Sequence, residues 1–249
     1  MQLFIVVNKQ DFIEVNNEAT DVIELSQEKV EAPHLMRRSR QTKSWTFMVY
    51  MDGDNDLEEV AITDFNEMEY GLYQSGLAEE MNVVIIFDRH SNYDSSNGNW
   101  VETRYYQIDP DNNLDMNIES TMISNLGEIN MGHPNTLTNF ITWALTNYPA
   151  DHSALVFWDH GNGIDSLCID ETNGDSLTYA EIYDGLVAVN NTLNESLHFD
   201  FIGADICFGQ LLEVTWQLRN FTDYYVASEA SEPTEGWAYD LTFSTFNDT

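Results

Sequence analysis

The segment Ala154-Leu-Val-Phe-Trp-Asp-His-Gly161 is a run of five apolar residues that ends abruptly on an acid, a histidine and a glycine. Such a run is typical of a short strand that is buried on both faces of a parallel sheet. The segment Phe199-Asp-Phe-Ile-Gly-Ala-Asp-Ile-Cys207 repeats the pattern and ends on a cysteine. Sites in open α/β sheets form beyond the carboxyl ends of the strands. His160 and Cys207 both fall there, so they are the first candidate site.

Predicted strands and helices alternate on both sides of these two segments. Further strands are expected at Trp45–Met51, Asn82–Phe87 and Tyr224–Ser228, and an edge strand at Trp100–Ile108. Helices are expected at Leu57–Tyr73, Leu137–Tyr148, Thr178–Val189 and Gly209–Leu218. This alternation predicts an α/β fold, a three-layer α/β/α sandwich with a mostly parallel sheet.

The first 43 residues differ in composition from the rest. They are polar and acidic and then turn basic over Arg37–Lys43. We interpret residues 1–43 as an N-terminal extension, a propeptide or a linker, with a strand near Leu3–Val7 and a helix near Ile23–Val30. One domain then covers residues 44–249, and its abrupt end suggests truncation at the C-terminus.

Charge is the most unusual property of the chain. Nine Lys and Arg against 43 Asp and Glu give a formal net charge of −34. Only Arg89, Arg104 and Arg219 among the basic residues follow Ser44. Such a surface repels phosphate backbones, which argues against nucleic-acid binding, and it attracts cationic partners. Adaptation to salt or simple solubility explains the bulk of the charge equally well.

A thiol nucleophile needs a base that takes its proton and N–H donors that hold the oxyanion. His160 precedes Cys207 by 207 − 160 = 47 residues, near the separation of about 50 in caspase-type enzymes. Gly161 would let a substrate approach the backbone, and Cys207 is expected to open a helix whose dipole activates the thiol. A single cysteine is more often a small buried apolar residue, as we expect for Cys168. Two such residues at neighbouring strand ends favour catalysis.

Several motifs in order resemble the clostripain-like cysteine peptidases. They are Ser44–Glu58, Phe157–Gly163, Asp170–Thr178 and Asp205–Gly209, followed by Ala227–Glu232 and Gly236-Trp237. The resemblance covers about Ser44 to Asp240 and implies the caspase-like fold of the clan of caspases, gingipains and legumain. It implies a cysteine endopeptidase that cleaves after Arg or Lys through a thioester acyl-enzyme. The dyad would be His160 and Cys207, with the amides of Gly161 and Cys207 as the oxyanion hole.

Members of this family bind the basic side chain through an acid two residues before the nucleophile, where Asp205 stands here. A buried Asp makes a charge-assisted contact to a guanidinium group. The alternative is that Asp205 caps the helix predicted after Cys207. Glu235 is a second candidate wall charge of the pocket. The usual Pro-Gly-rich stretch is replaced by Glu232-Pro-Thr-Glu-Gly-Trp237, which departs from the family pattern.

Many members are activated by self-cleavage after a basic residue between the His and the Cys. No Lys or Arg lies between His160 and Cys207, so that route is not expected here. The better candidate is Arg37–Lys43, which could occupy the pocket as an inhibitory segment until it is cut. An exposed linker without such a role explains this stretch equally well.

The chemistry requires no organic cofactor, and no pair of cysteines has zinc-site spacing. Asp52–Asp56 and Asp170–Asp175 are rich in oxygen ligands, but neither matches an EF-hand loop and turn chemistry explains both. We therefore assign no metal ligand from the sequence. Some relatives depend on calcium, so the resemblance leaves calcium open as a cofactor.

The rival function is a catalytically inactive acidic binding module on the same fold, and the retained dyad and Asp205 count against it. We expect a monomer that acts on peptides or proteins containing Arg or Lys. No apolar run approaches the ~20 residues of a membrane span. The family resemblance suggests a secreted or cell-envelope protein, although no signal peptide is recognisable in this chain.

Overall fold

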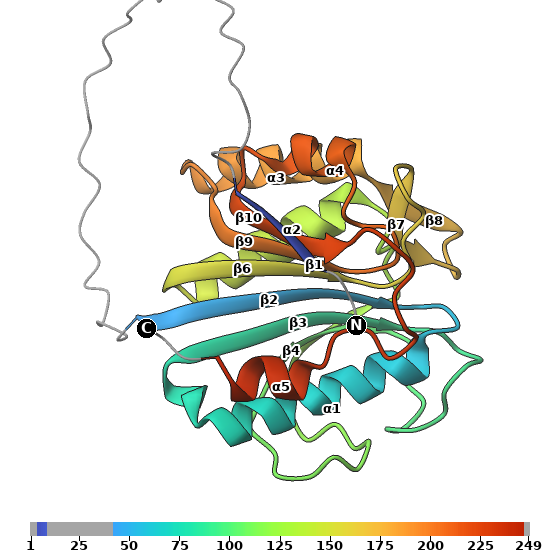
Figure 1. The fold of residues 1–249 in the computed structure, drawn as a ribbon. Helices are drawn as coiled ribbons and strands as arrows, with labels where there is room; N and C mark the ends of the chain where they lie inside the picture. The colour runs from blue at the N-terminus through green and yellow to red at the C-terminus, as the bar shows by residue number, and fades with distance from the viewer. Residues whose placement is uncertain (1–3, 9–41, 247–249) are drawn as a thin grey trace, which may run out of the picture.

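The computed structural model describes residues 4–8 and 42–246 (Figure 1). The strands are β1 (Phe4–Asn8), β2 (Lys43–Gly53), β3 (Met81–Arg89), β4 (Thr103–Gln107), β5 (Thr121–Gly127), β6 (Ala150–Trp158), β7 (Ser166–Asp170), β8 (Asp175–Thr178), β9 (Phe199–Asp205) and β10 (Thr222–Ser228). The helices are α1 (Glu58–Ser75), α2 (Pro134–Asn147), α3 (Tyr179–Leu193), α4 (Leu212–Leu218) and α5 (Tyr239–Ser244), with a 3₁₀ turn η2 at Leu77–Glu79.

The main sheet has the strand order β1-β10-β9-β6-β2-β3-β4-β5. Its five central strands, from β10 to β3, are parallel, whereas β1, β4 and β5 pair antiparallel at the two sides. β7 and β8 form a separate hairpin. The predicted mostly parallel sheet is therefore confirmed.

Helices cover both faces of this sheet (Figure 1). Helices α2, α3 and α4 pack on one face, and α1 and α5 pack on the other. The strand period of two explains the division, because alternate side chains point to opposite faces. In β2, Met48 and Tyr50 join the first core, whereas Phe47, Val49 and Met51 join the second. The three-layer α/β/α sandwich is confirmed.

The strand expected at the edge lies one position inside it. β4 pairs with β3 on one side and with β5 on the other. The sequence did not reveal β5 because most of its side chains are exposed and form no apolar run. The edge prediction for Trp100–Ile108 was therefore wrong.

The helix expected from Gly209 begins three residues later, at Leu212, with Leu211 as its N-cap. The amides of Phe208 and Gln210 donate instead to the carbonyls of Ala230 and Ser228, at 3.0 and 2.9 Å. Those bonds tie this stretch to the end of β10. Cys207 thus lies in a turn before α4, and the helix dipole that was expected to activate its thiol is not in place.

The N-terminal segment contributes β1, which pairs antiparallel with β10 and agrees with the strand expected near Leu3–Val7. The helix expected at Ile23–Val30 and all of Arg37–Lys43 except its last two residues lie outside the described residues. Within the described ranges, no helix is long and apolar enough to cross a membrane.

Candidate active site

The register of two neighbouring strands brings His160 and Cys207 together. β6 and β9 run parallel, and Trp158 is aligned with Asp205. His160 and Cys207 each follow two residues later, and adjacent strands lie about 4.8 Å apart. Both residues line one pocket of about 130 Å³. The other lining residues are Leu57, Trp158, Asp159, Asp205, Ile206, Glu232, Pro233, Thr234 and Gly236.

Gly161 is where the two loops touch. A Cβ atom at this position would lie 2.1 Å from the carbonyl oxygen of Cys207, far inside van der Waals contact. Only glycine permits this approach, because every other residue would push the loops apart. The two backbones that were predicted to form the oxyanion hole therefore lie against each other at the pocket.

The imidazole of His160 has a carboxylate partner that the sequence did not indicate. Its Nε2 lies 2.7 Å from Oδ1 of Asp56, which stands in the loop between β2 and α1. The side chain of Asn55 holds the same loop in place. Its Nδ2 donates to Oδ1 of Asp159 at 2.7 Å and to the carbonyl of Ile169 at 3.0 Å. Burial raises the pKa of Asp159 well above its ordinary value. Asp56 had been assigned only to a turn.

Cys207 carries a free, half-buried thiol. Its Sγ accepts a hydrogen bond from the backbone N–H of Glu232 at 3.3 Å. The second cysteine, Cys168, is fully buried in the core as expected.

Asp205 is the last residue of β9, and its carboxylate is almost fully buried at the pocket. Oδ2 accepts from the N–H of Trp237 at 3.1 Å. Gly236, at a φ of +58°, brings its backbone so close that a Cβ would lie 2.9 Å from the same oxygen. Burial raises the pKa of Asp205. The alternative role as a helix cap is wrong, because no helix begins at Cys207.

Glu232 is the second carboxyl group of this pocket. It is hydrogen-bonded to the Asp205 side chain, and its Oε1 accepts from Nε1 of Trp237 at 3.3 Å. Burial, followed by the neighbouring Asp205, raises the pKa of Glu232 to about 10. Glu232 therefore carries a proton at neutral pH. Glu235, for which a wall charge was predicted, is exposed and is not among the lining residues.

A third acid, Asp64, stands behind the pocket on the buried face of α1. Its Oδ2 accepts from Nε1 of Trp158 at 2.6 Å. Burial and the charge of Asp205 raise the pKa of Asp64 to about 9. A polar residue inside the apolar stripe of a helix was the only sequence signal for it.

This arrangement defines a class of protein. An α/β/α sandwich that carries a histidine and a cysteine on adjacent parallel strand ends, beside an acidic pocket, is the architecture of a caspase-like cysteine peptidase. A family model described as "Clostripain family" matches residues 49–248. The chain belongs to the clostripain family of cysteine peptidases.

Individual relatives agree with this assignment. Clostripain of Hathewaya histolytica is 31% identical over 221 residues, which is 80% of this chain and 41% of that protein. A secreted C11 cysteine protease of Bacteroides thetaiotaomicron, solved with an irreversible peptide inhibitor, superimposes with a TM-score of 0.67 at 29% identity, over 81% of this chain and 53% of that one.

A third comparison concerns the fold alone. An inactive zymogen C11 protease of Parabacteroides distasonis gives a TM-score of 0.63 at 23% identity, over 80% of this chain and 52% of that one. The chain thus spans about half the length of the proteins that it matches. Nothing in these comparisons favours the inactive binding module as the alternative function.

Proposed function

We propose that this chain cleaves peptide bonds after Arg or Lys, with Cys207 as nucleophile and His160 as base and acid. Sγ of Cys207 attacks the carbonyl carbon while His160 takes the thiol proton. The C–N bond breaks, His160 returns the proton to the leaving amine, and a thioester remains on Cys207. Water, deprotonated by His160, then attacks the thioester and releases the acid and the thiol. No organic cofactor enters these steps.

The pairing of His160 with Asp56 supports this division of labour. A carboxylate on Nε2 fixes the ring orientation and leaves Nδ1 as the nitrogen that serves the thiol. Asp56 touches neither substrate nor thiol in this scheme, so we regard it as a positioning residue. The amides of Gly161 and Cys207, whose backbones lie against each other, supply the oxyanion donors.

One observation carries the preference for basic residues: the Asp205 carboxylate is buried in the same pocket as His160 and Cys207. A carboxylate held in a low dielectric attracts a guanidinium or ammonium group far more strongly than it would in water. Without a ligand, Asp205 interacts instead with the proton of Glu232, through the hydrogen bond between the two side chains. A basic side chain would displace this proton, so the pocket gains a second negative charge, on Glu232, when the ligand arrives.

Fluorogenic peptides that end in Arg, Lys, Asp or Asn test the proposal. We expect turnover after Arg and Lys, and a loss of at least a thousandfold in kcat for Cys207→Ala and His160→Ala. Cys168→Ala is the matched control, because it removes the other thiol from the buried core and should keep the activity of the folded fraction. A wild-type chain that is folded but inactive would favour the binding module, and cleavage after Asp or Asn would contradict the role of Asp205.

We also propose that Arg37–Lys43 is a substrate of the enzyme itself and that the active chain is a monomer. The support is the sequence alone, in which the basic cluster precedes an acidic body. N-terminal sequencing of active protein should find a cut after a basic residue of this segment, and Cys207→Ala should keep its N-terminus. An intact terminus on fully active protein rejects the idea. Light scattering during size-exclusion chromatography measures the mass of the active species.

A further inference from the structure

A second hydrogen bond lies beside the one between His160 and Asp56. Asn55 immediately precedes Asp56, and Asp159 immediately precedes His160. Nδ2 of Asn55 donates to Oδ1 of Asp159 at 2.7 Å, which is also the distance between Nε2 of His160 and Oδ1 of Asp56. Two consecutive residues of the β2–α1 loop are therefore bonded to the two consecutive residues that follow β6.

The two hydrogen bonds differ strongly in exposure. Asn55 and Asp159 are 1% and 4% exposed, whereas the side chains of Asp56 and His160 are 64% and 38% exposed. Water competes for both ends of an exposed pair, so such a pair contributes little by itself. A buried hydrogen bond to a charged group is stronger, because breaking it leaves a polar group without a partner. The buried bond is therefore the one that can fix the separation of the two segments.

The amide group of Asn55 is bonded at both ends. Its Nδ2 also donates to the carbonyl of Ile169 at 3.0 Å, and its Oδ1 accepts from the N–H of Leu57 at 3.0 Å. Leu57 is one of the residues that line the pocket. A buried polar side chain whose donors and acceptor are all used makes its surroundings rigid. One side chain thus fixes the loop on both sides of Asp56.

Asp159 accepts hydrogen bonds from three N–H groups. Besides Asn55, the backbone N–H of Ile169 donates to its Oδ2, and the carboxylate accepts from the backbone N–H of His160. These donors favour the ionised form, against the burial that raises the pKa of Asp159. Because all three partners are donors, an amide at this position would direct an N–H group against one of them. Asp159 therefore joins the β2–α1 loop, the end of β6 and β7.

We propose that Asn55 and Asp159 are positioning residues for catalysis, which hold Asp56 and His160 at hydrogen-bond distance. The inference rests on the proposed function, in which His160 moves the protons. The β2–α1 loop cannot move away from His160 without breaking the buried bond first. A displacement of about 1 Å in a catalytic group can cost about a hundredfold in rate, so a rigid support for the ring has a direct effect on kcat.

Steady-state kinetics with an Arg-ended fluorogenic peptide test the proposal. Asn55→Ala and Asp159→Asn should each lower kcat about tenfold to a hundredfold, with KM changed less than about threefold. Asp159→Asn keeps the size and shape of the side chain, so it decides the question even where Asn55→Ala does not fold. An unchanged kcat in both variants overturns the proposal. Asp159 also lines the pocket, so a rise in KM alone would show that it binds substrate instead.

Asn66→Ala is the matched control. Asn66 is a buried amide of α1, 1% exposed, and its Nδ2 donates to the carbonyl of Ile62 at 3.2 Å within the same helix. The control removes the same group at the same burial, away from His160. It should lower Tm and keep kcat. A kcat that falls as far in Asn66→Ala as in Asn55→Ala would show a general loss of stability and overturn the proposal.

A double variant shows whether Asn55 acts through Asp56. If it does, Asn55→Ala combined with Asp56→Asn should lower kcat no further than the worse of the two single variants. Two independent losses would multiply. A double variant whose loss is the product of the single losses would therefore overturn the proposal.

Alkylation of Cys207 by iodoacetamide separates a failure of this inference from a failure of the proposed function. The experiment uses Cys168→Ala protein, in which Cys207 is the single thiol. At pH 7 we expect His160→Ala to slow alkylation at least ~10-fold and Asn55→Ala about threefold to tenfold, with no change in Asn66→Ala. A rate that does not depend on His160 overturns the proposed function and this inference together. A rate that depends on His160 but is unchanged in Asn55→Ala and Asp159→Asn overturns this inference alone.

Discussion

Two groups of acidic side chains are buried in this protein, and they are built in different ways. At the pocket, Asp205 and Glu232 bond to each other, so a shared proton satisfies both groups when nothing else is bound. In the second group, carboxylate oxygens of Asp54, Asp88, Glu128 and Asp170 lie within 4.8 Å of one another. All of these residues except Glu128 are buried, and Asp88 keeps one oxygen without a hydrogen-bond partner. The first group suits a ligand that comes and goes, because it has a stable empty state. The second group has no such arrangement, because a buried charged oxygen without a partner is costly.

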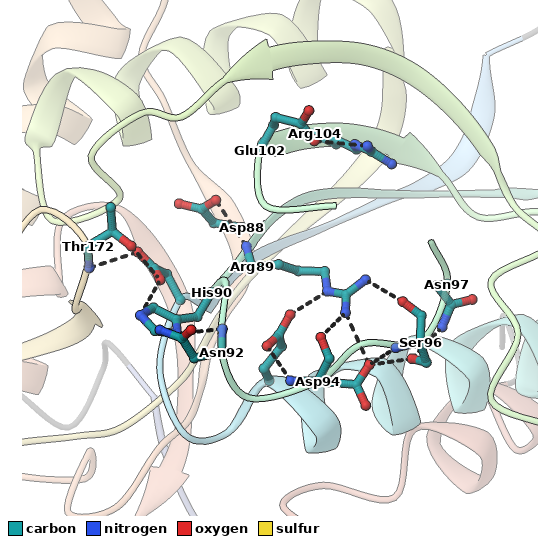
Figure 2. Close-up of polar contacts among 12 residues, drawn as sticks. Asp88, Arg89, His90, Asn92, Asp94, Ser96, Asn97, Glu102, Arg104 and Thr172 are labelled. Carbon is teal, nitrogen blue, oxygen red and sulfur yellow. Dashed lines mark hydrogen bonds and ion pairs between the residues drawn. The ribbon is translucent and has the colours of Figure 1, made fainter. Parts of the chain in front are cut away.

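Arg89, which follows Asp88, is a buried charge whose three guanidinium nitrogens all have hydrogen-bond partners. It is completely buried, with Nε on Glu58 at 2.6 Å and with Asp94 and Ser96 around the other guanidinium nitrogens (Figure 2). Its guanidinium also lies 4.7 Å from the ring centre of Trp100. Asp88 and Arg89 are neighbours in one strand, so their side chains point to opposite faces and cannot pair.

The largest effect is expected when the two acidic groups are disrupted one at a time and the changes in activity and in Tm are compared. Asp205→Asn should lower kcat/KM for Arg peptides about a hundredfold to a thousandfold, because it removes one partner of a buried charge pair. Asp88→Asn removes the unpartnered charge of the other group and should raise Tm while leaving kcat/KM nearly unchanged. Steady-state kinetics and thermal unfolding on one preparation measure both. A fall in kcat/KM in Asp88→Asn as large as that in Asp205→Asn would show that the two groups are one system.

The next largest effect is expected from Asp56, in the loop between β2 and α1. Asp56→Asn should lower kcat about tenfold with little change in KM, because the carboxylate orients His160 without touching substrate. Asp56→Glu should recover part of the loss. An equal fall in both variants would point to a disturbed loop, and an unchanged kcat would reject the positioning role.

A smaller effect is expected in the pH dependence of stability. The pKa of Glu232 is about 10 in the folded chain and ordinarily near 4.5. The folded state therefore binds the proton more tightly, and stability from this group is full below about pH 4.5 and lost as pH rises toward 10. Glu232→Gln keeps the neutral form and should flatten this decline in Tm. Identical slopes for the two proteins would contradict the protonated state.

The smallest effect should come from Asp64→Asn. Burial and Asp205 raise the pKa of Asp64 to about 9, so its side chain is neutral at pH 7 and an amide imitates it closely. We expect kcat/KM to change less than about threefold at pH 7. A tenfold fall would instead show that Asp64 carries its charge in the complex and contributes to binding of the basic side chain.

The central sheet and the meeting of His160 and Cys207 at one pocket could be predicted because both follow from local patterns. Fully buried parallel strands such as β6 and β9 are continuous apolar runs, and the strand end places the next polar residue at the sheet edge. Asp205 was predicted from the family resemblance, which places an acid two residues before the nucleophile. The start of α4 could not be predicted, because Phe208 and Gln210 bond to β10, which is a tertiary contact that overrides helical propensity.

The partners of the site were harder to predict. Asp56, Asp54 and Asp170 lie in turns, where Asp is common for purely local reasons. Asp54 and Asp170 lie close together only because the β7–β8 hairpin packs against the β2–α1 loop. The prediction of Glu235 failed for a similar reason, because the conformation of its loop brings Glu232 to the pocket and leaves Glu235 exposed.

Glu232 contacts both the proposed nucleophile and the proposed recognition residue, because its amide donates to Sγ of Cys207 and its side chain is hydrogen-bonded to Asp205. Any occupant that moves this side chain will also move the donor on the sulfur. A small guanidinium compound with no bond to cut should therefore change the rate at which iodoacetamide alkylates Cys207. The basic group of a covalent inhibitor would therefore change the rate at which Cys207 reacts with the electrophile, as well as directing the compound to the pocket.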